Sequence, residues 1–150
     1  MQRDTIGLEL FLLKLRIMKK KNPIEEARRY VQNAKDVLNN NTKLNVETGR
    51  YEDPKYVRAA GNYLWLGTLL ALDAVFHVRK DRRTRVHIDD YLEILSNRDK
   101  KLLDWVDSGY MVMHLYMNYD GIKDKKVCAQ GFCLANQIID RCETLLPKAS

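Results

Sequence analysis

One long apolar stretch, from Lys55 to Val78, constrains the fold of this chain more than any other part of the sequence. Between Tyr63 and Phe76 the only charged residue is Asp73, and apolar side chains occur on every side of the helical wheel. A helix that is apolar all round is typical of a buried core. We therefore expect this stretch to form the central helix, on which the other helices pack.

Small side chains recur along the same stretch at spacings of three and four residues. Such a seam lets a neighbouring helix approach closely, at the shallow crossing angle of a helix bundle. Gly61 and Gly67 each cost about 1 kcal/mol of helix propensity relative to alanine, so close packing is the expected reason for them. The seam consists of Ala60, Leu64, Gly67, Ala71, Ala74 and Val78.

The other periodic segments predict three further long helices and one short helix. Asn22 and Pro23 are typical of a helix start, and the amphipathic pattern that follows runs to about Asn40. Residues 41–53 lack a sustained period and are expected to form a loop. Asn97 is expected to cap the helix that begins at residue 98. The other helices are expected over residues 54–79, 88–95, 98–119 and 125–146, the last with Val127, Gly131, Leu134, Ile138, Cys142 and Leu145 facing inward.

These segments predict an all-α fold, a four-helix up-down bundle with one short extra helix and an additional N-terminal segment. We expect residues 1–17 to be an N-terminal extension and residues 18–150 to form one domain. The string MKKKNP resembles a bacterial N-terminus, so our hypothesis is that Met18 is the true start. The alternative is that residues 1–17 form an amphipathic helix that lies on the bundle.

Charge and cysteine content exclude several classes of protein. The net charge of +6 favours acidic partners only weakly, because it comes mainly from two clusters. Cys128, Cys133 and Cys142 form no C-x-x-C pair and have no histidine cluster to complete a zinc site, so we expect reduced, mostly buried thiols, no metal and no cofactor. No window approaches the ~20 uninterrupted apolar residues of a membrane span. We therefore expect a cytoplasmic protein that does not bind membranes.

Two polar stripes are candidates for chemistry. Asp107, Tyr110 and His114 share one face of the expected 98–119 helix, where a histidine between a carboxylate and a phenol suits general acid–base work. The alternative is that His114 and Tyr110 flank the core and satisfy each other or a carbonyl group.

The second stripe lies on the central helix and contains Asn62, Asp73 and His77. An acid in so apolar a helix needs a hydrogen-bonding partner, since burying an unpaired charge is costly. Tyr110, His114 or an arginine is the expected partner in a purely structural role. In the alternative, both stripes line one polar pocket for a ligand.

A basic connector follows the central helix. Its cationic side chains suit a phosphate backbone, although no aromatic side chains interleave with them, and a solvated loop is the plainer interpretation. The candidate nucleic-acid contacts are Arg79, Lys80, Arg82, Arg83, Arg85 and His87.

From about Met18 onward the sequence resembles a family of small, uncharacterised bacterial helical proteins. The strings that carry the resemblance are NPIEEARRYVQNAK from Asn22, AGN-x4-G-x-LLALDA from Ala60, HIDDY from His87 and HLYMNYDG from His114. More distantly, the order of helices is similar to that of HEPN-type bundles (higher eukaryotes and prokaryotes nucleotide-binding). It is also similar to that of the substrate-binding partners of nucleotidyltransferases.

The HEPN resemblance implies a dimeric helical domain that binds nucleotides or a partner protein. Active members cut RNA with an Arg-x4–6-His motif, which Arg82 and His87 match in spacing. The positions at that spacing before His114 hold Asp107, Ser108 and Gly109, so no such motif precedes His114.

We therefore expect a non-catalytic helical binding or interaction module, HEPN-like and homodimeric. The expected partners are a protein, a nucleotide or RNA. The alternatives are a HEPN-type ribonuclease and a partner of a nucleotidyltransferase.

Overall fold

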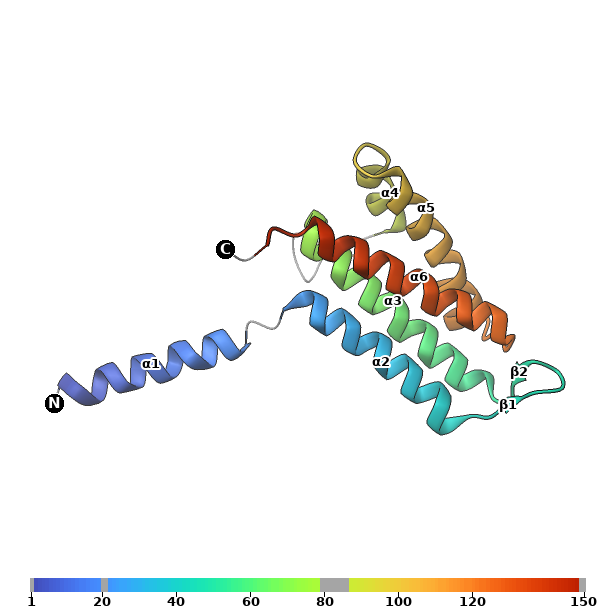
Figure 1. Ribbon diagram of the computed structural model, residues 1–150, viewed down its shortest axis with the longest axis horizontal. Coiled ribbons are helices and arrows are strands. Elements are labelled where there is room, and N and C mark those ends of the chain that lie inside the picture. The colour runs from blue at the N-terminus through green and yellow to red at the C-terminus, as the bar shows by residue number, and fades with distance from the viewer. Residues whose placement is uncertain (1, 20–21, 79–86, 149–150) are drawn as a thin grey trace.

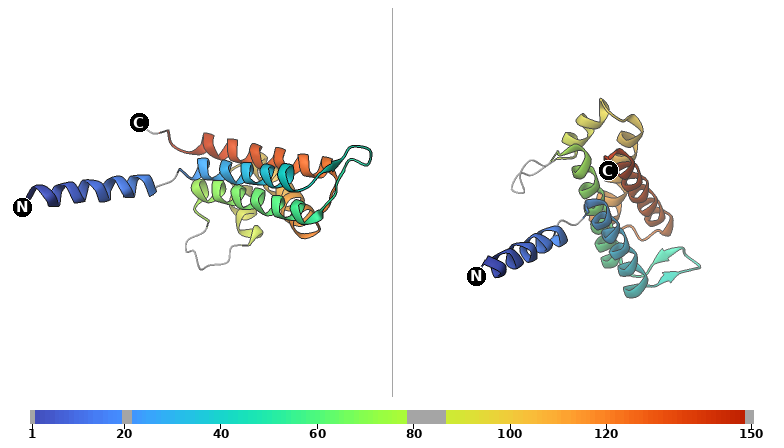
Figure 2. Two further views of the ribbon diagram at one scale, coloured as in Figure 1. Left: turned by 90° about the horizontal axis from the view of Figure 1, so that it is seen from below. Right: turned by 60° about the vertical axis from the view of Figure 1, so that its left-hand side comes forward.

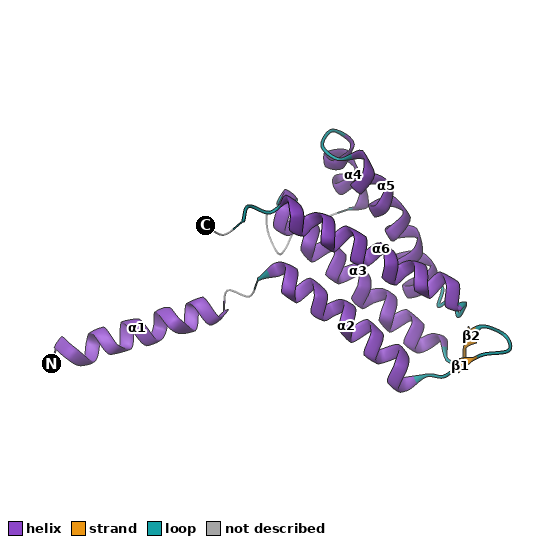
Figure 3. Ribbon diagram, viewed as in Figure 1, coloured by secondary structure: helices purple, strands orange, loops and turns teal. Residues whose placement is uncertain are grey.

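The computed structural model describes residues 2–19, 22–78 and 87–148, and most of them are helical (Figure 3). The all-α prediction therefore fits, with one small antiparallel sheet added. In chain order the elements are α1 (Gln2–Lys19), α2 (Pro23–Asn41), β1 (Leu44–Asn45), β2 (Arg50–Tyr51), α3 (Pro54–Phe76), α4 (Ile88–Ser96), α5 (Lys100–Gly109), the π-helix η1 (Tyr110–Tyr119) and α6 (Lys125–Leu145).

Helix α3 is the centre of the packed part of the molecule, as the sequence predicts. It lies beside α2 and α6 and also packs on η1, whereas α5 packs on α6, α4 and η1 (Figures 1 and 2). Ala60, Leu64 and Ala71 are fully buried, whereas Ala74 and Val78 at the end of the seam are half-buried. By length and composition alone, α3 is the one described helix that is long and apolar enough to cross a membrane. Here it is the core helix.

The glycines of α3 stand where neighbouring helices come very close. A methyl group at Gly67 would lie 2.9 Å from the carbonyl oxygen of Ala27 on α2. One at Gly61 would lie 2.6 Å from Cβ of Met117 on η1. The prediction that these glycines serve close packing is therefore confirmed.

Side-chain caps set the helix starts. Asn22 Oδ1 accepts from the backbone amide of Ile24 at 3.0 Å, which confirms the predicted start of α2. The expected cap at Asn97 is wrong, because Asp99 Oδ1 accepts from the amide of Leu102 at 3.0 Å. Asp99 also binds Arg141 of α6 at 2.8 Å. Burial alone raises the pKa of Asp99, but the hydrogen bonds from Leu102 and Arg141 outweigh it, and the pKa is lowered.

Residues 41–53 are not the plain loop that the sequence predicts. Helix α2 continues to Asn41, and β1 and β2 then pair as a short hairpin. Asn45 Oδ1 accepts from the amides of Glu47 and Thr48, and Gly49 closes the turn at a φ of 66°. The hairpin exists because these residues satisfy the turn locally, a pattern too short to show as a period.

Helix ends and faces give two further corrections. The central helix stops at Phe76, because His77 adopts a left-handed φ of 51° and its amide donates to Asp73 O. Leu145, expected to face inward, is 38% exposed, since it lies in the last turn of α6. Of the three cysteines, Cys128 and Cys142 are buried as expected, but Cys133 is exposed.

The helix expected over residues 98–119 changes type half-way. α5 is α-helical to Gly109, and Tyr110–Tyr119 are π-helical. π-Helical turns are rare and are frequent at functional sites. Gly121, with a φ of 62°, follows the end of this helix, as the sequence predicts.

Helix α1 stands apart from the packed helices (Figures 1 and 2). Several of its apolar side chains, among them Ile6, Leu8 and Phe11, are more than half exposed. The alternative to an upstream extension was an amphipathic helix that lies on the bundle. Residues 2–19 are helical, but this helix does not lie on the other helices. The division at residue 17 stays a prediction.

Replacement of Gly61 by alanine tests the close approach of α3 to η1. The added methyl group would also lie 2.7 Å from the backbone atoms Met113 O and Asn118 N, which cannot rotate away. Overpacking costs about 1–3 kcal/mol, against a gain in helix propensity of about 1 kcal/mol. We expect Gly61→Ala to lower the free energy of unfolding by about 1–2 kcal/mol in urea titrations.

The matched control is Gly7→Ala, because a methyl group at Gly7 meets nothing within 4 Å. It should leave the main unfolding transition unchanged. A Gly61→Ala protein as stable as the wild type would contradict this packing account.

Candidate functional site

A groove of about 550 Å³ runs between α2 and α6. The two helices are antiparallel, since Arg28 near the start of α2 contacts Asp140 and Glu143 near the end of α6. Figure 1 shows both helices lying alongside α3. The hairpin closes the other end, where Lys125 N donates to Gly49 O and Tyr51 N donates to Lys123 O, both at 2.9 Å.

The groove has an apolar floor and a polar rim. The floor is buried or half-buried and consists of Val31, Leu38, Tyr51, Cys128 and Phe132. The rim consists of the half-buried Arg28 and the exposed Gln32, Lys35, Asn39, Lys125, Ala129 and Asn136.

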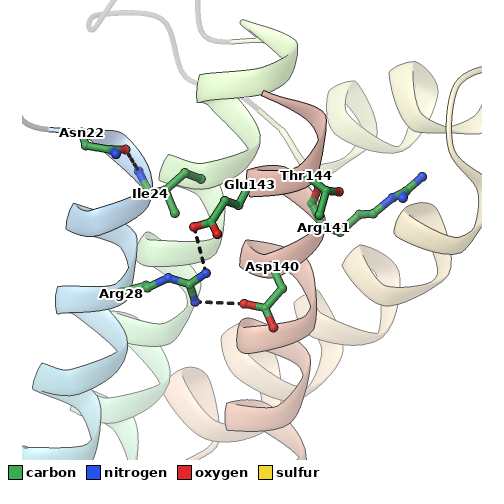
Figure 4. Close-up of polar contacts among 7 residues, drawn as sticks. All are labelled: Asn22, Ile24, Arg28, Asp140, Arg141, Glu143 and Thr144. Atoms are coloured by element: carbon green, nitrogen blue, oxygen red, sulfur yellow. Dashed lines mark hydrogen bonds and ion pairs between the residues drawn. The ribbon is translucent and has the colours of Figure 1, made fainter. Parts of the chain in front are cut away.

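Arg28 spans the groove at one end and is already bound. Its guanidinium donates to Asp140 Oδ1 at 2.9 Å and to Glu143 Oε2 at 3.1 Å, as Figure 4 shows. Burial alone would lower the pKa of Arg28, but the bonds to the two carboxylates outweigh it and raise the pKa. Arg28 is therefore paired with two carboxylates of α6, which together carry one more charge than the guanidinium, and these bonds join the two helices at this end of the groove.

The other two cations of the groove have no such balance. Lys35 and Lys125 form no ion pair within the described part of the chain, and both side chains are exposed on the rim. The lining itself contains no carboxylate. The charged lining residues without an ion pair are therefore two lysines over an apolar floor, and the carboxylate of Asp124 at the start of α6 also acts on that floor, at Cys128.

The titratable groups of the floor are neutral at physiological pH. Burial, followed by the nearby Cys128, raises the pKa of Tyr51. Burial, followed by the charge of Asp124, raises the pKa of the Cys128 thiol to about 12. Since the thiolate is the nucleophilic form of cysteine, Cys128 is inert here. The floor offers contact surface, a phenol and a thiol, but no base.

Sequence reasoning missed this groove, because no single segment contains it. Its lining comes from α2, β2 and α6, and Tyr51 reaches it only through the unpredicted hairpin. The available signal was Asn45 followed by Gly49, which is typical of a tight turn.

The first predicted stripe is partly brought together. The rings of Tyr110 and His114 lie 5.3 Å apart, and Trp65 of α3 contacts both, at 5.7 and 5.8 Å between ring centres. Asp107 is exposed. The imidazole Nδ1 of His114 is buried without a hydrogen-bond partner in the described residues, so His114 does not satisfy Tyr110 or a carbonyl through that atom.

Asp73, in the second predicted stripe, bonds to a tyrosine of α4 that the sequence did not indicate, and the arginine alternative stays a prediction. Asp73 Oδ1 accepts from the hydroxyl of Tyr91 on α4 at 2.9 Å, rather than from Tyr110 or His114. His77 is exposed at the end of α3, and Asn62 is exposed on its outer face. A pocket shared by both stripes stays a prediction.

Most of the basic connector lies outside the described residues, namely Arg79, Lys80, Arg82, Arg83 and Arg85. His87 is described and precedes α4, where its backbone amide donates to Asp90 Oδ2 at 2.9 Å. Among the described residues, no group of acidic, histidine and cysteine side chains is arranged to hold a metal ion.

Known proteins resemble most of this chain. The domain described as Domain of unknown function (DUF5618) matches residues 22–144, which contain both helices of the groove almost entirely. Among solved structures, a protein of unknown function from Dyadobacter fermentans is 42% identical, with a TM-score of 0.74, and the match covers 83% of this chain and 96% of that chain. No curated protein matches the chain.

The burial of His114 predicts how the stability of the folded chain depends on pH. Burial lowers the pKa of His114 below its usual 6.5, so between the two values the unfolded chain binds the proton and the folded chain does not. Stability due to the neutral imidazole is present above pH 6.5 and is lost as the pH falls towards the folded pKa. We expect the imidazole of His114 to titrate below 6.5 by NMR.

His114→Phe is the matched variant, because it keeps a ring against Trp65 and Tyr110 without a titrating group. Between pH 7.5 and 5 its melting temperature should fall less than that of the wild type. Parallel profiles, with a titration midpoint at 6.5 or above, would show that His114 is not desolvated.

Proposed function

The chain belongs to the family of the domain of unknown function DUF5618, and we propose that it is a non-catalytic binding module whose ligand lies in the α2–α6 groove. The observation that supports this proposal is the groove's division into apolar floor and polar rim. Ligand sites in proteins are typically concave, of about 300–1,000 Å³, and apolar with a few polar groups that fix orientation. The groove fits that description in size and in lining.

The chemistry of the lining supports binding without reaction. A hydrolytic or transfer site needs a base or an activated nucleophile within reach of its substrate. The lining residues, all in the described part of the chain, include neither a carboxylate nor a histidine. Cys128 is held as the neutral thiol, with a pKa of about 12. A ligand in this groove is therefore expected to leave unchanged.

A HEPN-like relationship, a homodimer and a cytoplasmic location belong to the same proposal. Support for a dimer comes from apolar side chains that α3 and η1 expose, among them Leu66, Met111 and Tyr119, which is 73% exposed. Exposed apolar groups of this kind are typical of protein–protein contacts when they gather in one patch. Sedimentation of the purified protein measures this part of the proposal separately from ligand binding.

A side chain that fills the groove should abolish binding. Ala129 lies on the rim and is exposed, so Ala129→Trp adds bulk over the floor without disturbing the core. We expect compounds from a library of small polar aromatic molecules to raise the melting temperature of the wild type but not of this variant. A ligand at 100 times its Kd stabilises the folded state by about 2.7 kcal/mol, which such a scan detects.

Gln130→Trp is the matched control, since Gln130 is the next residue of α6, is exposed and does not line the groove. It should respond to the same compounds as the wild type. Compounds that stabilise all three proteins equally, or none of them, would refute the groove as the binding site.

The proposal also predicts that RNA remains intact. Purified protein incubated with single-stranded and double-stranded RNA should leave both unchanged on a denaturing gel. The decisive outcome for the ribonuclease alternative is cleavage by the wild type that His87→Ala or His114→Ala removes, and that outcome would overturn the non-catalytic assignment.

A further inference from the structure

We infer that the groove between α2 and α6 binds a small organic anion, with a flat apolar body and at least one carboxylate, sulfonate or phosphate group. This inference rests on the proposed function and adds the chemical class of the ligand. The features that support it are the sign of the charges on the rim and the composition of the floor.

The charges on the rim select for an anion. Every charged lining residue is a cation, on α2 at Arg28 and Lys35 and on α6 at Lys125. Arg28 is paired with two carboxylates, Asp140 and Glu143, so its charge is not available to a ligand and that end of the groove does not attract an anion. Lys35 and Lys125 remain without ion pairs in the described residues, one on each side of the groove. A cleft lined by charge of one sign concentrates ligands of the opposite sign.

The N-terminus of α6 is not the group that would bind the anion. Free amides at a helix N-terminus attract anions, but here Asp124 Oδ1 already accepts from Lys126 N at 2.7 Å and from Val127 N at 3.3 Å. The carboxylate of Asp124 therefore occupies the position that a ligand anion would take. The ammonium groups of Lys35 and Lys125 are left as the recognition elements.

The apolar floor of the groove favours a ligand that has an apolar part as well as a negative charge. Phe132 of α6 and Tyr51 of β2 contribute aromatic surface, and Val31 and Leu38 of α2 contribute aliphatic surface. A bare phosphate or sulfate ion would leave this surface exposed to water. A flat apolar body covers it and gains about 25 cal/mol per Å² buried. The side-chain amides of Asn39 and Asn136 on the rim then satisfy polar edges of the ligand.

Two dyes with nearly the same rings separate charge from shape. 1-Anilinonaphthalene-8-sulfonate carries one sulfonate, and N-phenyl-1-naphthylamine is its neutral counterpart, and both fluoresce more strongly in apolar sites. We expect the wild type to bind the sulfonate more tightly than the neutral dye. Raising the salt concentration from about 50 mM to about 500 mM should weaken the sulfonate complex only.

Charge reversal on each side of the groove locates the anion. Lys35→Glu and Lys125→Glu should each weaken sulfonate binding by about five- to tenfold, as expected for an exposed charge pair replaced by repulsion, and leave the neutral dye unchanged. Lys126→Glu is the matched control, because Lys126 is exposed, adjacent to Lys125 and outside the lining. It should bind both dyes like the wild type. Circular dichroism confirms that each variant is folded, and Lys35→Gln and Lys125→Gln give smaller losses of the same kind.

The outcomes distinguish the inference from the proposal on which it rests. If Ala129→Trp abolishes binding of both dyes but the wild type binds them equally, the groove is a binding site and the anion inference is wrong. If Ala129→Trp changes neither dye, the groove itself is refuted. If sodium sulfate alone displaces the sulfonate dye at concentrations close to the dye's own Kd, the requirement for an apolar body is overturned.

Discussion

The absence of a side chain at a few helix positions governs how this molecule packs. Gly67 lets the backbone of α2 approach α3 to contact distance, and Gly61 does the same for η1. Gly131 of α6 adds a third such position, where a methyl group would lie 2.6 Å from Met117 Sδ and 3.5 Å from Leu64 Cδ1. At each of these glycines the neighbouring helix therefore packs closely against the core. Because α2 and α6 are drawn towards the centre rather than towards each other, a groove remains between their outer surfaces.

The two ends of that groove have different chemistry, and this difference gives it a direction. At one end Arg28 joins α2 to the carboxylates of α6, so positive and negative charge are both present there. At the other end Tyr51 of the hairpin and Lys125 of α6 both line the groove, and the lining contains no carboxylate. The neutral phenol and thiol of the floor provide contacts but no reactive group. Binding is therefore better supported by this geometry than catalysis.

The sequence predicts those features that repeat along one helix. The seam of α3 from Ala60 to Ala71 and the cap at Asn22 follow from spacing and residue type alone, and both are confirmed. Features that depend on one or two residues are missed, such as the hairpin that Asn45 and Gly49 form. The change to a π-helix at Tyr110 is missed as well, because its side chains continue the same three-four pattern.

The candidate site is harder to predict than the fold, for a physical reason. A groove is set by the distance between helices, and that distance depends on contacts between residues far apart in the chain, such as Gly67 with Ala27. Partners of buried polar groups are uncertain for the same reason. Asp73 needs a donor, as its apolar surroundings indicate, but only the position of α4 shows that Tyr91 is that donor.

The three cysteines of α6 are unequally buried, so one of them can be labelled selectively. Cys133 is exposed beside Phe132 of the groove floor, whereas the thiols of Cys128 and Cys142 are buried, each with its pKa raised to about 12. Because thiolate is the species that reacts with maleimides, a fluorophore or spin label should attach to Cys133 in the native chain without any engineering. Occupancy of the neighbouring floor then becomes an optical or magnetic signal.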